Sequence, residues 1–146
     1  MNKLTTVMHF PINIDNHHWM YAFISVEHEA IFFMDSIASL INTSVKKRIV
    51  QFANTIITRP NIAFKPVYCA SPFQGVGDGV SCGVITIFNI LKVSKAEHDG
   101  ELDCLLTDQK WGKKLFTTSE KVDIRANLVD IIRGTKTVDV LFKFLN

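Results

Sequence analysis

Cys82 is the residue whose position most strongly suggests chemistry. It follows a glycine-rich loop, residues 70–80, and precedes an apolar stretch that predicts a helix over residues 83–95. At a helix N-terminus, the macrodipole and the free N–H groups favour a thiolate over a thiol, and the thiolate is the nucleophilic form of cysteine. The plainer interpretation is a small apolar residue in a buried helix, because free cysteine is often buried.

A cysteine nucleophile needs a base, and the base needs a group that orients it. His18 stands immediately before Trp19 at the start of one apolar segment, and Asp35 directly follows another, residues 31–34. Adjacent antiparallel strands place the start of one strand beside the end of the next. We therefore expect His18 and Asp35 to meet at one end of a sheet. Each residue alone has an ordinary structural explanation, and His17 is a weaker candidate for the same role.

Gln74 is a candidate for stabilising negative charge during acyl transfer. It lies in the glycine-rich loop, eight residues before Cys82. Acyl transfer needs hydrogen-bond donors for the developing oxyanion. The Gln74 side-chain amide and the Cys82 backbone N–H could supply them. Taken alone, Gln74 is more simply a solvated loop residue.

Composition limits the class of protein. The chain has 146 residues, of which 47% are hydrophobic and 21% charged, and it has a net charge of +2. These values predict one globular domain, and the charge is too small to favour nucleic acid as a partner. The spacing of the three cysteines matches no zinc motif, and free thiols favour a reducing compartment. No signal-peptide core is evident, and the most apolar stretch, residues 80–91, is too short to cross a membrane.

The pattern of apolar residues predicts the elements that would position these side chains. The expected strands are residues 4–14, 19–26, 30–34 and 63–69, the first and last at sheet edges because of Pro11 and Pro66. The expected helices are residues 45–56, 83–95, 120–133 and 138–145, with 97–112 as a polar loop. Thr43 or Ser44 could cap the first helix, and Ser81 the second. An early antiparallel hairpin mixed with helices favours an α+β fold over a parallel doubly wound sheet.

Four short motifs, in this order, resemble a known family. They are His18-Trp19, Asp35-Ser36, Gln74 and the run Ser81-Cys82-Gly83-Val84. The segments PINIDNHHWMYAFISV, IFFMDS and SCGVITIFNIL resemble those of the ubiquitin-like-protein-specific cysteine proteases, the SUMO protease group with an adenovirus-type protease fold. In papain-like proteases, by contrast, the cysteine comes first. The resemblance covers roughly residues 7–91.

This resemblance implies a fold, an activity and a partner. The fold would be an α+β cysteine-protease fold, a small mixed sheet flanked by helices with the nucleophile at a helix N-terminus. Cys82 would be the nucleophile, His18 its general base, Asp35 the group that orients His18, and Gln74 part of the oxyanion hole. Trp19 would form one wall of a tunnel that admits a diglycine tail. The partner would be a ubiquitin-like modifier such as SUMO and its conjugates, in the cytoplasm or nucleus, with no cofactor, metal, nucleic acid or membrane.

Three features depart from the family pattern. Gln74 lies eight residues before Cys82, where the family usually has six, and Ser81 replaces the aspartate that is commonest there. The helices and strand that precede the histidine strand in the family, with a second tunnel tryptophan, have no counterpart. Residues 1–146 are therefore expected to form a single C-terminal catalytic domain. A shortened domain, a fragment of a longer gene product and a degenerate copy all fit this pattern.

Three functions remain open at this point. The favoured one is a thiol protease or isopeptidase that cleaves after the diglycine tail of a ubiquitin-like modifier, as in deSUMOylation. The second is a catalytically inactive modifier-binding module of the same fold. The third is an acyltransferase that uses the same His-Asp-Cys set. Trp111, Cys69 and Cys104 are expected to be structural residues.

Overall fold

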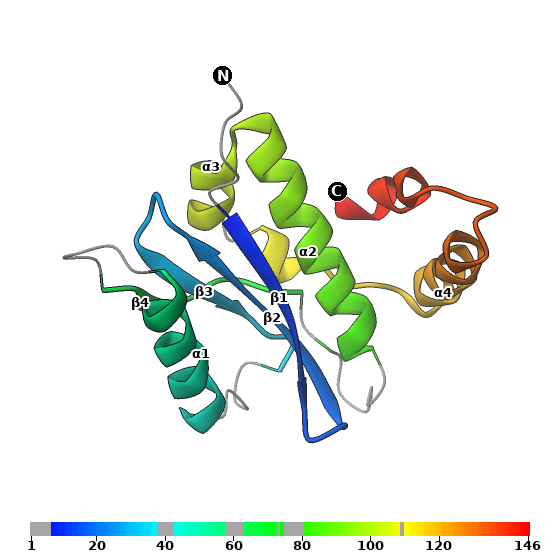
Figure 1. The fold of residues 1–146 in the computed structure, drawn as a ribbon. Helices are drawn as coiled ribbons and strands as arrows, with labels where there is room; N and C mark the ends of the chain where they lie inside the picture. The colour runs from blue at the N-terminus through cyan, green and yellow to red at the C-terminus, as the bar shows by residue number, and fades with distance from the viewer. Residues whose placement is uncertain (1–6, 38–42, 58–62, 73, 75–80, 109) are drawn as a thin grey trace.

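The computed structural model describes residues 7–37, 43–57, 63–72, 74, 81–108 and 110–146. Its strands are β1 (Val7–Ile14), β2 (His18–Ser25), β3 (Ala30–Met34) and β4 (Lys65–Tyr68). Its α-helices are α1 (Thr43–Ile56), α2 (Cys82–Asp99), α3 (Leu102–Thr107) and α4 (Thr118–Ile132). Two 3-10 helices, η1 (Trp111–Lys113) and η2 (Val138–Leu145), complete the set (Figure 1).

The four strands form one mixed sheet in the order β1-β2-β3-β4. β1 and β3 pair antiparallel with β2, whereas β4 pairs parallel with β3. The two proline-containing strands, β1 and β4, lie at the sheet edges, as predicted. Asp15 and Asn16 turn the chain between β1 and β2 with φ of 51° and 58°. Asparagine and aspartate tolerate this left-handed conformation better than most residues, and the tight turn makes His18 the first residue of β2.

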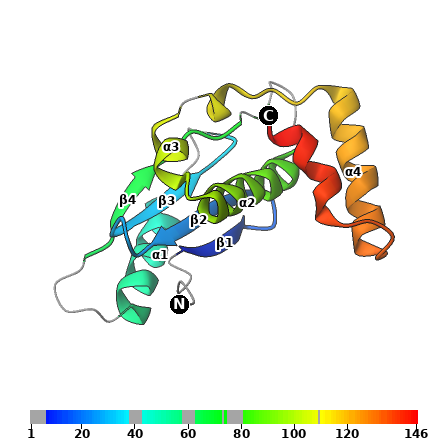
Figure 2. The same cartoon turned by 90° about the horizontal axis from the view of Figure 1, so that it is seen from above.

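The central strand β2 is buried on both faces. Tyr21 and Phe23 pack in the core on the α2 side, with Phe88 of that helix. Met20 and Ile24, on the alternate face, pack in a second core with Ala53 of α1. Side chains alternate between the faces of a strand, so an unbroken apolar sequence is what a two-sided strand needs. α1 and α2 therefore lie on opposite sides of the sheet (Figures 1 and 2).

The segment between α2 and α4 corrects the sequence prediction. Residues 97–112 were expected to be a polar loop, but α2 continues to Asp99, and α3 and η1 follow. Gly100 ends α2 in the left-handed conformation, with φ of 71°. Leu102 and Leu105 of α3 pack against the core, and Trp111 is only 5% exposed. A few apolar side chains are enough to anchor this segment, although most of its residues are polar, and Trp111 is the packing residue that was expected.

Helix ends also differ in detail from the prediction. Ser81 occupies the N-cap position of α2, but its side chain does not make the capping hydrogen bond. α1 begins at Thr43, so the two residues proposed as its cap, Thr43 and Ser44, lie within the helix. α4 begins two residues earlier than expected because Thr117 and Glu120 form a reciprocal capping box. The last predicted helix has the expected bounds but is a 3-10 helix.

The C-terminal elements η2 and α4 pack on the side of the molecule that carries α2. η2 contributes Leu141, Phe144 and Leu145 to the core that includes Phe88 of α2. α4 lies on the far side of η2 from α2 (Figure 2). The Lys92 ammonium group of α2 donates a hydrogen bond to the Leu145 carbonyl at 2.9 Å. Within the described ranges, no helix is both long and apolar enough to span a bilayer.

Gly112 provides a test of how tightly η1 packs on the segment that precedes Gln74. A Cβ on Gly112 would lie 2.7 Å from the Cβ of Ala70, which cannot rotate away. We expect Gly112→Ala to lower the free energy of unfolding by about 1–3 kcal/mol because the two segments must separate. Gly134→Asn is the control, since Gly134 has φ of 77° and open space around it, and asparagine tolerates that conformation. Thermal denaturation measures both variants, and an unchanged melting temperature for Gly112→Ala would show that this packing is loose.

Candidate active site

The pairing of β2 with β3 brings His18 and Asp35 together. Tyr21 pairs with Met34, so the start of β2 and the residue after β3 lie at the same end of the sheet. His18 Nε2 donates a hydrogen bond to Asp35 Oδ1 at 2.6 Å. The side chains are 13% and 1% exposed, respectively. Burial strengthens such a charge-assisted contact, because little water competes for either group.

Asp35 is also held by its own backbone. The Ile37 N–H donates to Asp35 Oδ1 at 3.0 Å, which fixes the carboxylate at the end of β3. His18 therefore meets an acceptor of fixed position. With Nε2 engaged by Asp35, Nδ1 is the ring nitrogen left to exchange a proton elsewhere. His17, the weaker candidate, does not take this place, because it lies in the hairpin turn. His28 contacts Asp103 instead.

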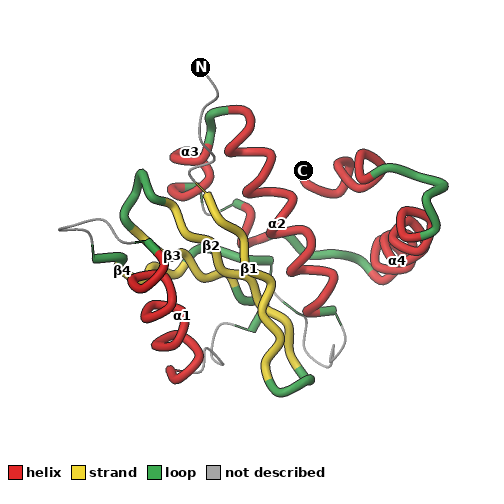
Figure 3. Tube along the Cα trace, in the orientation of Figure 1, coloured by secondary structure: helices red, strands yellow, loops and turns green. Residues whose placement is uncertain are grey.

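Cys82 is the first residue of α2 and is 6% exposed. The next residue, Gly83, shows what the start of α2 lies against. The ring of Trp19 covers Gly83, and a Cβ on Gly83 would lie 3.6 Å from Trp19 Cδ1. Trp19 follows His18, and Gly83 follows Cys82, so the start of β2 and the start of α2 are in contact. Both lie at the lower end of the molecule in Figure 3.

Gln74 is buried against Ser36 and is not a solvated loop residue. It is 4% exposed. Its backbone N–H donates to the Ser36 carbonyl at 2.9 Å, and its side-chain Oε1 accepts a hydrogen bond from Ser36 Oγ at 3.2 Å. Ser36 directly follows Asp35 in the chain. The longer spacing between Gln74 and Cys82 therefore does not turn Gln74 towards solvent. Residues 75–80, which carry the extra length, lie outside the described residues.

A buried polar network fixes the segment that leads into Gln74. The Trp111 indole N–H donates to Asn89 Oδ1 at 2.8 Å, and Asn89 Nδ2 donates to Ser71 Oγ at 2.9 Å. The Cys69 N–H donates to the Phe33 carbonyl at 2.9 Å. Sequence reasoning did not assign Asn89 a role. The sequence feature that could have identified Asn89 is a carboxamide within an apolar stretch of a predicted helix. A buried amide needs hydrogen-bond partners, so such a residue indicates a buried polar contact.

A second cluster has the residue types of a Ser-His-Asp triad but not its accessibility. Ser25 Oγ lies 2.7 Å from His28 Nδ1, and His28 Nε2 lies 2.5 Å from Asp103 Oδ1. The Ser25 residue is 0% exposed, so its hydroxyl cannot reach a substrate. The cluster instead ties the β2–β3 turn to α3.

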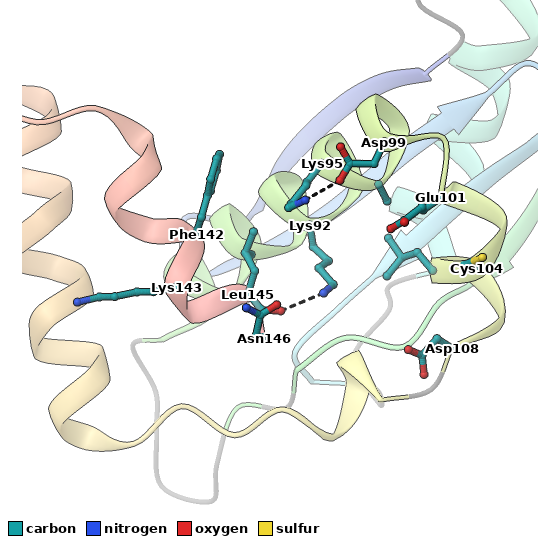
Figure 4. A pocket seen from close by; sticks show the side chains of 12 residues that line it. Lys92, Lys95, Asp99, Glu101, Cys104, Asp108, Phe142, Lys143, Leu145 and Asn146 are labelled. Carbon is teal, nitrogen blue, oxygen red and sulfur yellow. Dashed lines mark hydrogen bonds and ion pairs between the residues drawn. The ribbon is translucent and has the colours of Figure 1, made fainter.

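The other two thiols lie in different surroundings. Burial raises the pKa of Cys69 to about 12, so this thiol is protonated at neutral pH. Cys104 is exposed on α3 and borders a cavity of about 490 Å³ between the C-terminal half of α2, α3 and η2 (Figure 4). The residues described around that cavity include no histidine. The described residues around Cys104 therefore offer its thiol no histidine as a base.

Three solved structures with a similar fold are of SUMO protease Ulp1, with its catalytic cysteine oxidised to a sulfenic, sulfonic or sulfinic acid. The sulfenic acid form has a TM-score of 0.56 and 19% identity, covering 82% of this chain and 49% of that chain. The sulfonic acid form has a TM-score of 0.53 and 19% identity, with the same coverage. The sulfinic acid form has a TM-score of 0.50 and 21% identity, covering 73% and 47%.

These similarities show the α+β fold with a small mixed sheet that the sequence predicted. The chain spans about half the length of these solved structures. No curated protein sequence matches it. The family model described as the Ulp1 protease family, C-terminal catalytic domain, matches residues 3–120. That range takes in most of the 146 residues, and the chain therefore belongs to the Ulp1 protease family.

Proposed function

We propose that this chain is a thiol protease and isopeptidase that cleaves after the diglycine tail of a ubiquitin-like modifier. The observation that carries the proposal is the 2.6 Å contact of His18 with buried Asp35, at the end of the sheet where Trp19 packs on the residue after Cys82. A nucleophile, a base and a group that orients the base are the set that acyl transfer through a thioester uses. Membership of a protease family supports the same assignment.

In the proposed mechanism, Asp35 holds the Nε2–H of His18, so Nδ1 accepts the proton of Cys82 Sγ. The thiolate attacks the carbonyl carbon of the last glycine, and the carbonyl oxygen becomes an oxyanion. The Cys82 N–H and the Gln74 carboxamide donate hydrogen bonds to it. The imidazolium of His18 then protonates the leaving amine, and a thioester to Cys82 remains. Water, deprotonated by His18, attacks the thioester, and the thiol returns with the free carboxylate.

The buried carboxylate has a definite role in this cycle. His18 becomes positively charged when it takes the thiol proton, and the negative charge of Asp35 stabilises that imidazolium. Because the Asp35 side chain is only 1% exposed, water screens this interaction little. The Asp35 carboxylate therefore stabilises His18 most when His18 is an imidazolium and Cys82 a thiolate, which is the state that attacks the substrate.

A diglycine tail fits the surroundings of Cys82. Trp19 is 41% exposed and its ring lies against Gly83, so an aromatic side chain lies next to the residue that follows the nucleophile. Glycine is the residue that can pass close to such a face, because it has no side chain. The solved structures of similar fold are SUMO proteases, which makes SUMO the first modifier to test.

We propose the cytoplasm or the nucleus as the place of action. Cys69, Cys82 and Cys104 are free thiols, and thiols persist in reducing compartments. We also propose that residues 1–146 act as a single C-terminal catalytic domain.

The experiment that tests the activity uses a SUMO protein whose C-terminal glycine carries a thiol-reactive electrophile. We expect one covalent adduct, located at Cys82 by peptide mass spectrometry, and none with Cys82→Ser. A ubiquitin probe of the same chemistry distinguishes the modifiers. An adduct at Cys69 or Cys104 would contradict the assignment. Retained SUMO binding with neither adduct nor turnover would favour an inactive binding module, and acetyl transfer from acetyl-CoA would favour an acyltransferase.

Asp35→Asn tests the role of the buried carboxylate. Asparagine keeps the size of the side chain but removes the charge that stabilises the His18 imidazolium, so we expect kcat for a SUMO precursor to fall by about 100-fold or more. Asp103→Asn is the matched control, because Asp103 makes a similar contact with His28 away from Cys82. Its activity should stay within about twofold, since exposed ion pairs contribute little. Turnover at the parent rate in Asp35→Asn would remove Asp35 from the site.

A further inference from the structure

Ser36 and Gln74 form a buried two-point contact that the mechanism above does not explain. The Gln74 N–H donates to the Ser36 carbonyl, and Ser36 Oγ donates to Gln74 Oε1, at 2.9 and 3.2 Å, respectively. Ser36 is 2% exposed and Gln74 is 4% exposed. The first bond fixes the backbone of Gln74 against the end of β3, and the second fixes its side chain.

In the second bond, the oxygen end of the carboxamide faces Ser36. A carboxamide oxygen can only accept hydrogen bonds, and its NH₂ group can only donate them. When Ser36 Oγ–H donates to Oε1, the oxygen is turned towards Ser36 and the NH₂ group is turned away from it. An oxyanion needs the NH₂ group, because the carboxamide oxygen would repel it.

We propose that Ser36 is a positioning residue that orients the Gln74 carboxamide so that its NH₂ group serves the oxyanion. This inference rests on the proposed protease function. Asp35 orients the base, His18, and Ser36 orients the oxyanion donor, Gln74. Two consecutive residues that follow β3 therefore position both groups. The hydrogen bond from Asn89 Nδ2 to Ser71 Oγ also holds the segment that leads to Gln74.

The kinetic test is a double-mutant cycle measured on a SUMO precursor. We expect Ser36→Ala to lower kcat by about tenfold and to change KM by less than about twofold, because the oxyanion forms only in the transition state. Gln74→Ala should lower kcat by about 100-fold. Adding Ser36→Ala to Gln74→Ala should then lower kcat by less than about twofold further, since Ser36 acts through Gln74.

Ser25→Ala is the matched control. It also removes a buried serine hydroxyl that is hydrogen-bonded, at the far end of β2. We expect it to lower the melting temperature without changing kcat. An unchanged kcat in Ser36→Ala would overturn the proposal. An equal loss of kcat from Ser36→Ala in the parent and in the Gln74→Ala background would overturn it as well.

A measurement on the resting protein separates this proposal from the proposed activity. The side-chain NH₂ signals of Gln74, followed by ¹⁵N relaxation, should indicate a rigid group in the parent and in Ser25→Ala, and a mobile one in Ser36→Ala. If the chain shows no turnover but Ser36→Ala mobilises Gln74, the proposed activity fails and the positioning role of Ser36 is supported. If the signals stay rigid in Ser36→Ala, the positioning role is overturned whether or not the chain is active.

Discussion

The hydrogen bond between His18 and Asp35 is the contact on which the rest of the site depends. A carboxylate that is 1% exposed is costly to bury unless a partner meets its charge. Asp35 finds this compensation at Oδ1, which accepts hydrogen bonds from the Ile37 N–H and from the imidazole. The imidazole can be in place only if β2 begins opposite the end of β3. A register shift of one residue would turn His18 to the other face of the sheet and leave Asp35 without its histidine.

The core maintains that register. β2 presents Tyr21 and Phe23 to α2 and Met20 and Ile24 to α1, so sliding the strand would move its residues out of both cores at once. The same packing places α2 across β2, with Trp19 on Gly83. A helix start, which favours a thiolate, thus contacts Trp19, the residue that follows His18. Stability and the proposed chemistry therefore depend on the same strand.

Much of this arrangement could be predicted from the chain itself. Tight turns and alternating or unbroken apolar runs are local signals, and they predicted the hairpins, the meeting of His18 with Asp35 and the position of Cys82 at a helix start. Contacts between segments that are distant in the sequence leave no such local pattern. The burial of Gln74 against Ser36 depends on how residues 63–72 pack along β3. For this reason the sequence alone did not exclude the plainer alternative for Gln74, a solvated loop residue, whereas the structure does. The helical character of residues 102–107 was missed because few of their side chains reach the core.

The relative reactivity of the three thiols tests the central claim most directly. Iodoacetamide alkylation of the native protein at neutral pH can be followed at each cysteine by mass spectrometry. Cys69, with its pKa raised to about 12 by burial, and exposed Cys104 serve as internal references. If His18 and the start of α2 favour the thiolate, Cys82 reacts fastest although it is buried, and His18→Ala removes that advantage. Equal labelling of Cys82 and Cys104, or an unchanged rate at Cys82 in His18→Ala, would contradict the account.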